Sequence, residues 1–433
     1  MEKLLHVAAL ANDTALSLGA QIACCTAAES EKKEFNVDGG EFSLFRTLFD
    51  RSVSVTVFKD QKKGRIALNR FDDDAVREAV KTCVASLADS QPDPDWEIAS
   101  GVGRRDFVSG CPDPDTEKLF FRTKELLETV RQRYPLILME QMIVSHSRRR
   151  SVYLSTTGNE YRSLSGCYDV SLMFSAHDGD RSTSFYGTGA RAADLDTPFI
   201  DLALMDREIA DVQNQLDAAP TEGKFTGRVI LAPNCLISTV IGPVMENFAS
   251  DDTLIDGTSL WKNSLGDAVA SEKLSVRLAP RDKLIVCGEN YTSEGYIAQD
   301  FDFIKKGKLS AFLCSQYGAN KTKNKRAPND SSSVIVERGD TPLEKMIASV
   351  DRGLLVARFS GGNPSANGEF SGVAKNGFLI ENGRIARAVS ETMISGNLAD
   401  MLKNIASVSS DYMTDGYSAA PYIAFDGVTV SGK

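Results

Sequence analysis

The sequence predicts an α+β fold, with an N-terminal domain of helices and a small sheet at residues 1–220 and a β-rich domain at 225–433. Apolar residues recur at helical spacing over 4–18 and 76–87. Val53, Val55 and Val57 alternate with polar residues, which is the period of a half-buried strand. Short apolar runs between closely spaced glycines at 353–397 favour antiparallel strands and tight turns in the second domain.

The amino-acid composition of the chain limits the classes of function that the protein can have. The chain has 433 residues and a net charge of −10, so its surface does not suit general binding to nucleic acids or anionic membranes. No apolar run approaches the roughly 20 residues of a membrane span, and the N-terminus is expected to form an amphipathic helix rather than a signal peptide.

The eight cysteines are scattered and form no C-x-x-C motif, which favours reduced thiols in a cytoplasmic protein. The adjacent Cys24 and Cys25 fit either a redox or metal pair or two buried thiols. We favour buried thiols, because neighbouring side chains of a strand point to opposite faces of the sheet.

The first 90 residues are expected to form a helix at 4–18, a strand at 20–27, a charged turn at 29–34 and a hairpin whose second strand covers 65–69. Asp72, Asp73 and Asp74 then begin a helix. We interpret them as a helix cap rather than a metal-binding cluster, because acidic residues favour first turns.

Residues 90–117 are expected to form a linker that ends at Asp115, the cap of a helix. The inward side chains of that helix are predicted to be Leu119, Phe120, Leu126, Leu127, Val130 and Tyr134. An antiparallel meander should follow, with strands at 136–144, 151–155, 161–174 and 182–187.

Two histidines fall in the meander. His146, beside Arg148, Arg149 and Arg150, fits either an anion site or a charged turn or edge strand, and we favour the second. His177 is expected in an exposed turn.

Farther along, we expect a helix at 205–217, a strand at 227–232 and an apolar helix at 233–248 that bends near Gly242 and Pro243. The basic run 320–326 fits either a contact with an acidic partner or a solvated loop, and we favour the loop. Thr341 to Glu344 has the form of a capping box for a helix at 342–350.

The segment 353–397 carries the strongest hairpin pattern, Asn382-Gly383 between two apolar runs. Two polar loops are expected at 360–372 and 388–397, where a site or an interface would lie. A Ser371–Lys375 pair is compatible with a nucleophile, but we favour a solvated lysine in a turn.

Three segments resemble the C-terminal sequence of the TldD/PmbA family, whose members were historically described as modulators of DNA gyrase. They are RFSGGNP, GEFSGVAKNGFLIENGRIARAVSETMISGN and APYIAFDGVTVSGK. The resemblance is long over 225–433 and weaker over 1–110. Within the family the chain looks like the PmbA/TldE side.

TldD-type relatives carry a His-Glu-x-x-x-His helix and a C-terminal cysteine that hold zinc, with the glutamate acting on bound water. The resemblance places that helix motif near 238–243 and the cysteine within 411–420, and this sequence has neither histidine nor cysteine there. Its three histidines are His6, His146 and His177. We therefore predict no catalytic or metal-ligating residues and no cofactor in this chain.

The resemblance implies a cytoplasmic heteromeric peptidase in which a TldD-like subunit carries zinc and this chain completes the chamber around unfolded or small peptides. Two other hypotheses are a self-sufficient hydrolase with an unrecognised site, in the form of a homodimer when isolated, and a peptide-binding scaffold. The residues below fit a substrate groove or partner interface, although Gly361, Gly362 and Gly372 fit turns equally well. They are Arg358, Ser360, Gly361, Gly362, Asn363, Phe370, Ser371, Gly372, Lys375, Asn376, Ser390, Glu391 and Thr392.

Overall fold

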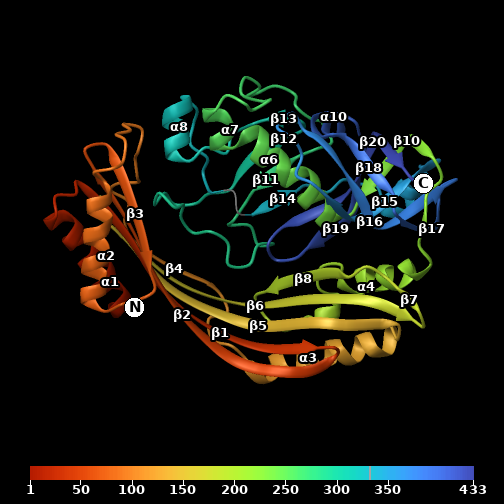
Figure 1. The fold of residues 1–433 in the computed structure, drawn as a ribbon, viewed down its shortest axis with the longest axis horizontal. Helices are drawn as coiled ribbons and strands as arrows, with labels where there is room; N and C mark the ends of the chain where they lie inside the picture. The colour runs from red at the N-terminus through yellow and green to blue at the C-terminus, as the bar shows by residue number, and fades with distance from the viewer. Residues whose placement is uncertain (331–332) are drawn as a thin grey trace.

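The computed structural model describes residues 1–330 and 333–433. Two β-sheets form the framework of the molecule (Figure 1). In these residues the first sheet has eight strands, β1 to β8, and the second has twelve, β9 to β20. The first sheet is long and curved and passes beneath the C-terminal half (Figure 1). Helices pack against both sheets, which confirms the α+β class.

The N-terminal sheet has the order β3-β2-β1-β5-β6-β4, with β7 and β8 paired to β6. The antiparallel pairing of β5, β6 and β8 confirms the expected meander, although the two strands expected at 136–144 and 151–155 form one continuous strand, β5. The bounds are β1 Ile22–Asp38, β2 Glu41–Lys59, β3 Lys62–Leu68, β4 Gly103–Gly110, β5 Ile137–Ser155, β6 Asn159–Asp178, β7 Arg181–Ser182 and β8 Tyr186–Ala192.

The prediction of a charged turn at 29–34 is wrong, because these residues continue β1 and pair with both β2 and β5. Glu29 lies opposite Arg150, and Glu31 lies opposite Arg148. Opposite charges in facing positions stabilise a strand pair. The partner charges that keep this segment extended are more than a hundred residues away, so the local sequence did not reveal them.

Three helices cover one face of this sheet: α1 Glu2–Ser17, α2 Asp73–Ser86 and α3 Thr116–Arg133. The capping interpretation of Asp72 is confirmed, because its Oδ1 accepts a hydrogen bond of 3.0 Å from the Ala75 N–H. Cys25 is buried beneath α1 and α2, and Cys24 faces a separate aromatic cluster, so both adjacent thiols are buried as predicted.

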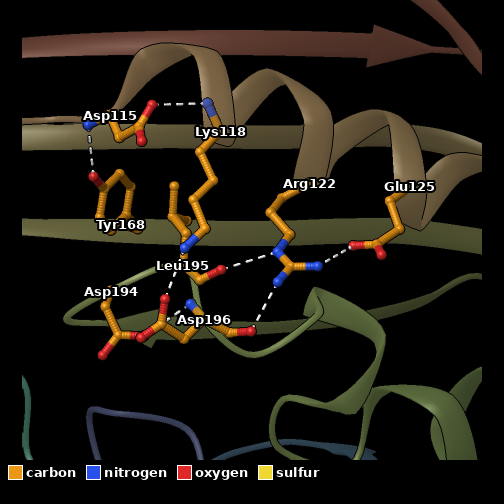
Figure 2. A network of polar contacts seen from close by, with 8 residues as sticks. All are labelled: Asp115, Lys118, Arg122, Glu125, Tyr168, Asp194, Leu195 and Asp196. Carbon is orange, nitrogen blue, oxygen red and sulfur yellow. Dashed lines mark hydrogen bonds and ion pairs between the residues drawn. The ribbon is translucent and has the colours of Figure 1, made fainter.

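Asp115 caps α3 as predicted by accepting a bond of 2.9 Å from the Lys118 N–H (Figure 2). Arg122 on the same helix donates to the carbonyl oxygens of Leu195 and Asp196, at 2.9 and 2.8 Å. This network fixes α3 to the segment that leaves β8 (Figure 2). The inward position predicted for Phe120 is wrong, because its side chain is exposed.

Three further expectations in this half need correction. The linker at 90–117 contains β4, which pairs in parallel with β6. His146 lies in neither a turn nor an edge strand: it is buried in the middle of β5, and its Nε2–H donates to the Cys111 carbonyl oxygen at 2.7 Å. His177 is exposed as expected but lies within β6 rather than in a turn.

The C-terminal sheet has the order β13-β12-β11-β14-β20-β10-β15-β16-β17-β9, with β18 and β19 attached through β20. Most of its pairs are antiparallel. The bounds are β9 Ala219–Pro220, β10 Lys224–Leu231, β11 Val276–Leu278, β12 Phe301–Lys305, β13 Lys308–Leu309, β14 Val334–Val336, β15 Arg352–Gly361, β16 Glu369–Glu381, β17 Arg384–Ser390, β18 Met393–Asn397, β19 Ile405–Thr414 and β20 Ala419–Ser431.

Helices and helical turns pack around this sheet. The side chains of α6 and of the helices next to it fill the core of this half. They are η1 Phe199–Asp201, α4 Met205–Gln213, η2 Asn214–Asp217, α5 Pro233–Leu236, η3 Ile237–Ile241, α6 Gly242–Ala249, α7 Asp251–Ile255, α8 Gln316–Thr322, α9 Leu343–Ala348 and α10 Leu398–Lys403. The expected irregularity near Pro243 is present as the π-helical turn η3, which joins α5 to α6.

The predicted hairpin is confirmed: Asn382 and Gly383 both have positive φ, at 49° and 74°, as a two-residue turn requires. The prediction of a capping box before α9 is wrong. Pro342 is the N-cap, and the Leu343 N–H donates to Asp411 Oδ2 at 2.8 Å, so a residue remote in sequence replaces the expected Thr341 cap.

The two halves meet at a polar and aromatic junction. Trp96 stacks on Tyr317 of α8, with ring centroids 3.7 Å apart. Lys321 pairs with Asp93 at 2.9 Å and with Asp95 at 3.2 Å. Part of the basic run at 320–326 therefore belongs to α8 and contacts acidic residues of this same chain, which corrects the solvated-loop interpretation.

Candidate functional site

A groove of about 550 Å³ lies where β16 and β18 of the C-terminal sheet meet the segment that joins β15 to β16. Its lining is mostly neutral and polar, with one aromatic ring and one carboxylate, that of Glu369. The lining residues are Gly362, Asn363, Ser365, Glu369, Phe370, Ser371, Ser395, Gly396 and Asn397.

Side chains from two helices hold the loop at 362–368 in place. Asn397 is the N-cap of α10, and its Nδ2 donates to the Asn367 carbonyl oxygen at 2.8 Å. Asn247 of α6 donates to the Pro364 carbonyl oxygen at 3.5 Å. Gly368 has φ +86° and lies so close to Phe248 that a Cβ atom would be 2.8 Å from the ring. The loop thus depends on glycine at this turn.

Gly361 and Gly372 lie opposite each other in the β15–β16 ladder, beneath the ring of Phe359. A Cβ atom on Gly372 would be 2.4 Å from Phe359 Cζ, and one on Gly361 would be 2.6 Å from it. The ring in turn packs against Phe370 at a centroid distance of 5.8 Å. These two glycines therefore leave space for the ring of Phe359 next to the groove, and neither position has room for a side chain.

The end of β15 offers an open backbone edge. Among the described strands, β10 pairs only with Gly353 to Val356 of β15, whereas Arg358 to Gly361 pair with β16 alone. Ser360 and Gly361 are exposed. An unpaired strand edge of this kind can accept an extended peptide through main-chain hydrogen bonds.

The polar loops expected at 360–372 and 388–397 are largely strand. Only 362–368 and 391–392 are irregular, because β18 pairs with both β16 and β20. Of the predicted site residues, Gly362, Asn363, Phe370 and Ser371 line the groove together, and Ser360, Gly361 and Gly372 border it.

The other predicted residues have different surroundings. Arg358 donates to the Phe185 carbonyl oxygen at 2.5 Å, and Lys375 lies opposite it in the ladder. Thr392 is buried against the hydroxyl of Thr221, and Glu391 forms an ion pair with Lys433. Ser390 and Asn376 complete this set, with Ser390 donating to the Ala218 carbonyl oxygen and Asn376 buried at φ 48°.

Sequence inspection missed five lining residues: Ser365, Glu369, Ser395, Gly396 and Asn397. All five lie within the two predicted polar loops at 360–372 and 388–397, yet their side chains could not be assigned to one surface without the β16–β18 pairing. A Ser371–Lys375 nucleophile is not supported, because residues four apart along a strand are separated by roughly 13 Å.

The segment at 238–243 does not fit a zinc ion. Ser238 uses its hydroxyl to bond the Asn234 carbonyl oxygen at 2.8 Å, and Ile241, Gly242 and Pro243 have no ligating side-chain atoms. Within residues 1–330 and 333–433, no group of three or more His, Cys, Asp or Glu side chains is arranged to hold a metal.

The three histidines lie on three different elements, α1, β5 and β6, and none of them lines the groove. His6 pairs with Asp73 at 3.0 Å, on the outer helices. Burial among β-strands lowers the pKa of His146. His177 contacts the Ser175 hydroxyl at 2.9 Å at the end of β6. None of these contacts brings an imidazole to a serine or cysteine of the groove.

Most cysteines are poor nucleophiles, since burial raises the pKa of Cys235 and of Cys314 to about 12. Cys287 is different: the Cys167 thiol hydrogen-bonds to it and lowers its pKa to about 6. Its Sγ lies 3.4 Å from the Gly166 carbonyl oxygen, at the junction of the halves and outside the groove.

Two carboxyl groups between α4 and the C-terminal half have raised pKa values because they are buried. Glu208 accepts hydrogen bonds from the Tyr186 hydroxyl and from Asn234 Nδ2, both at 3.0 Å. The pKa of Asp211 is raised to about 6. Through Asn234, Glu208 fixes the start of α5 and thereby the helix that supports the groove.

A second groove, of about 700 Å³, lies on the N-terminal sheet and includes Arg148 and Arg150. Carboxylates neutralise both arginines: Arg150 pairs with Glu29 at 3.4 Å, and Arg148 pairs with Asp113 at 3.6 Å. Glu31 and Asp50 also line the groove. The mixed charge does not favour an anion site beside His146.

Known proteins resemble both the sequence and the fold. Residues 223–432 match the family model described as PmbA/TldA metallopeptidase C-terminal domain. The chain is 24% identical to metalloprotease PmbA of Escherichia coli O157:H7 over 406 residues, which cover 89% of this chain and 84% of that protein.

Two solved structures have the same fold. TldE from Thermococcus kodakarensis superposes with a TM-score of 0.83 at 19% identity, covering 99% of this chain and all of that one. A protein described as a modulator of DNA gyrase, from Bacteroides thetaiotaomicron, superposes with a TM-score of 0.82 at 21% identity over the full length of both chains. In the described part of this chain, no helix has the length and apolar character to cross a membrane.

Proposed function

This chain belongs to the PmbA/TldD family, and we propose that it is the metal-free partner subunit of a TldD-type zinc metallopeptidase that processes or degrades unfolded peptides. In this proposal the TldD-like subunit carries the zinc ion and the general base, and both subunits act in the cytoplasm. The eight free cysteines are consistent with that reducing compartment.

One observation carries the proposal: the helix that would supply zinc ligands has none to offer. The segment at 238–243 contains Ser238 and Thr239, whose hydroxyls contact groups of the same helical segment, followed by two apolar residues, glycine and proline. A catalytic zinc needs about three protein ligands and an open position for water. The lack of ligands here supports the proposal that another subunit supplies the chemistry.

The groove supports a role in holding substrate. The open edge at Arg358 to Gly361 can pair with the backbone of an extended peptide, whatever its sequence. Ser371, Ser395 and Asn363 line the groove and offer neutral hydrogen bonds there. A site that recognises main chain more than side chains suits unfolded peptides of varied sequence.

A tryptophan in the groove tests this role. Ser371→Trp places a large ring on the exposed groove face of β16, and Glu381→Trp places the same ring at the exposed far end of that strand. In a mixture with the TldD-like subunit, we expect Ser371→Trp to reduce kcat/KM for an unfolded peptide at least about tenfold, equivalent to about 1.4 kcal/mol. Glu381→Trp should leave it unchanged.

Two results would count against the groove. Equal activity of the two variants would show that the peptide binds elsewhere. Equal loss in both, with subunit association intact by size-exclusion chromatography, would show that the tryptophan acts through the strand and not through the groove.

A further inference from the structure

Two cysteines from different halves of the chain meet where the two sheets join. Cys167 lies on β6, and Cys287 lies in the segment between β11 and β12. The Cys287 Sγ atom is 3.4 Å from the carbonyl oxygen of Gly166, the residue that precedes Cys167, and the two thiols are hydrogen-bonded to each other. Two sulfur atoms that are more than a hundred residues apart in the sequence are thus in contact.

The backbone around Cys287 holds its sulfur against β6. Cys287 has a φ of 55°, in the left-handed region that favours glycine. Gly110, at the end of β4, leaves space for the sulfur, because a Cβ atom there would be 2.7 Å from Cys287 Sγ. A residue other than glycine in this region stores conformational strain, and such strain is concentrated at functional sites.

The two thiols differ in protonation and in exposure. The hydrogen bond from Cys167 lowers the pKa of Cys287 to about 6, and the same bond together with burial raises the pKa of Cys167. Cys287 is half-buried, whereas Cys167 is buried. At neutral pH the pair therefore presents a thiolate that solvent can reach and, beside it, a neutral thiol. An accessible thiolate next to a second cysteine is typical of redox-sensitive sites.

We propose that Cys287 is a site of oxidation by hydrogen peroxide and that Cys167 converts the product into an intrachain disulfide between the two halves. The Cys287 sulfur attacks one peroxide oxygen, the O–O bond breaks, and the departing hydroxide takes up a proton and leaves as water. The Cys167 sulfur then attacks Sγ of the sulfenic acid, the S–O bond breaks, and the Cys167 proton leaves with the hydroxide as a second water. Two thiols are oxidised to one disulfide, and one peroxide is reduced to two waters.

The disulfide adds a covalent bond between β6 and the segment that joins β11 to β12. A cross-link between residues so distant in sequence strongly restricts the unfolded chain and thereby stabilises the folded one. In a reducing compartment such a bond forms transiently and is reversed by thiols. None of the groove residues takes part, so the inference does not rest on the proposed function.

Peptide mapping of the full chain tests the link. After treatment with hydrogen peroxide and alkylation in denaturant, we expect a non-reducing digest to contain one peptide pair joined through Cys167 and Cys287. The number of free thiols should fall by two per chain, and dithiothreitol should restore both. Cys287→Ser and Cys167→Ser should each abolish the link.

Cys111→Ser is the matched control. Cys111 is as partly exposed as Cys287 and its N–H donates to the same Gly166 carbonyl oxygen at 2.7 Å, but its thiol donates to the Asp113 carbonyl oxygen at 3.1 Å. We expect the link between Cys167 and Cys287 to form unchanged in this variant. The mapping of the parent chain decides the question even if a serine variant fails to fold.

Two further measurements separate the roles of the two thiols. In Cys167→Ser the sulfenic acid has no partner thiol, so dimedone should label Cys287, whereas Cys287→Ser should show no label at Cys167. At pH 6 the parent chain should form the disulfide at least about tenfold faster folded than in urea, because an unfolded cysteine has its ordinary pKa and little thiolate. Urea unfolding of the oxidised chain should have a higher midpoint than that of the reduced chain.

Three results would overturn the inference. The first is a parent chain that keeps all its thiols or carries only sulfinic acid after peroxide treatment. The second is a disulfide that involves Cys111 or joins two chains. The third is a link that forms equally fast in urea, because the folded arrangement would then have no part in it. Peptide cleavage in the mixture with a TldD-like subunit is a separate readout, so either proposal can fail while the other stands.

Discussion

At the scale of single residues, Asp211 shows how burial couples this fold to pH. Its folded-state pKa of about 6 lies above the unfolded value of 3.8, because burial disfavours the carboxylate despite Arg207, 3.6 Å away. The folded state therefore binds more protons than the unfolded state between about pH 4 and 6. The free energy of unfolding should fall as pH rises through this window.

We expect Asp211→Asn to remove this effect. At pH 7 the variant should be more stable than the parent by no more than about 3 kcal/mol, the full cost of the shift. At pH 4 the two should be nearly equal. Urea unfolding at both pH values measures the difference, and a variant that is less stable at pH 7 would show that the ion pair with Arg207 outweighs desolvation.

Local rules predicted some residues well and others not at all. Asp72 and Asp115 could be assigned as caps because a cap bonds the helix that immediately follows it. The burial of Glu208 and the partial burial of Asp211 could not be recognised, because their surroundings come from β8, α5 and the C-terminal half. The burial of His146 escaped prediction for the same reason.

At the scale of elements, the packing of Phe359 beside the groove depends on the facing glycines of β15 and β16. Gly372→Ala should destabilise the chain by about 1–3 kcal/mol, because its Cβ would overlap the ring of Phe359. Gly362→Ala is the control, since a Cβ atom there has no neighbour within 4 Å. Thermal unfolding of both variants measures the effect, and equal stability would mean that Phe359 moves aside freely.

The sequence placed the hairpin of β16 and β17 correctly, because an Asn-Gly turn is encoded in two adjacent residues. It did not place the groove. The stretch after residue 388 looks like a loop until β18 is seen to pair with β16 and β20. Strand pairs that are distant in sequence leave little local pattern, which also explains the missed extension of β1 and the missed β4.

At the scale of the whole molecule, two sheets meet at a junction of stacked rings and ion pairs, of which Trp96 with Tyr317 and Lys321 with Asp93 are examples. The α+β class followed from the periodicity of each half, but this junction did not, since it joins segments more than two hundred residues apart. The C-terminal half supplies a peptide-sized groove and no zinc ligands at 238–243. These features support the proposal that a partner subunit performs the chemistry.

The most direct test is cleavage of an unfolded peptide by this chain alone, by a TldD-like subunit alone and by their mixture, each with and without a chelator. We expect the mixture to cut far faster than either chain and the chelator to stop it, while this chain alone shows no cleavage. Chelator-sensitive cleavage by this chain alone would contradict the account and would require a metal site formed by residues other than those at 238–243.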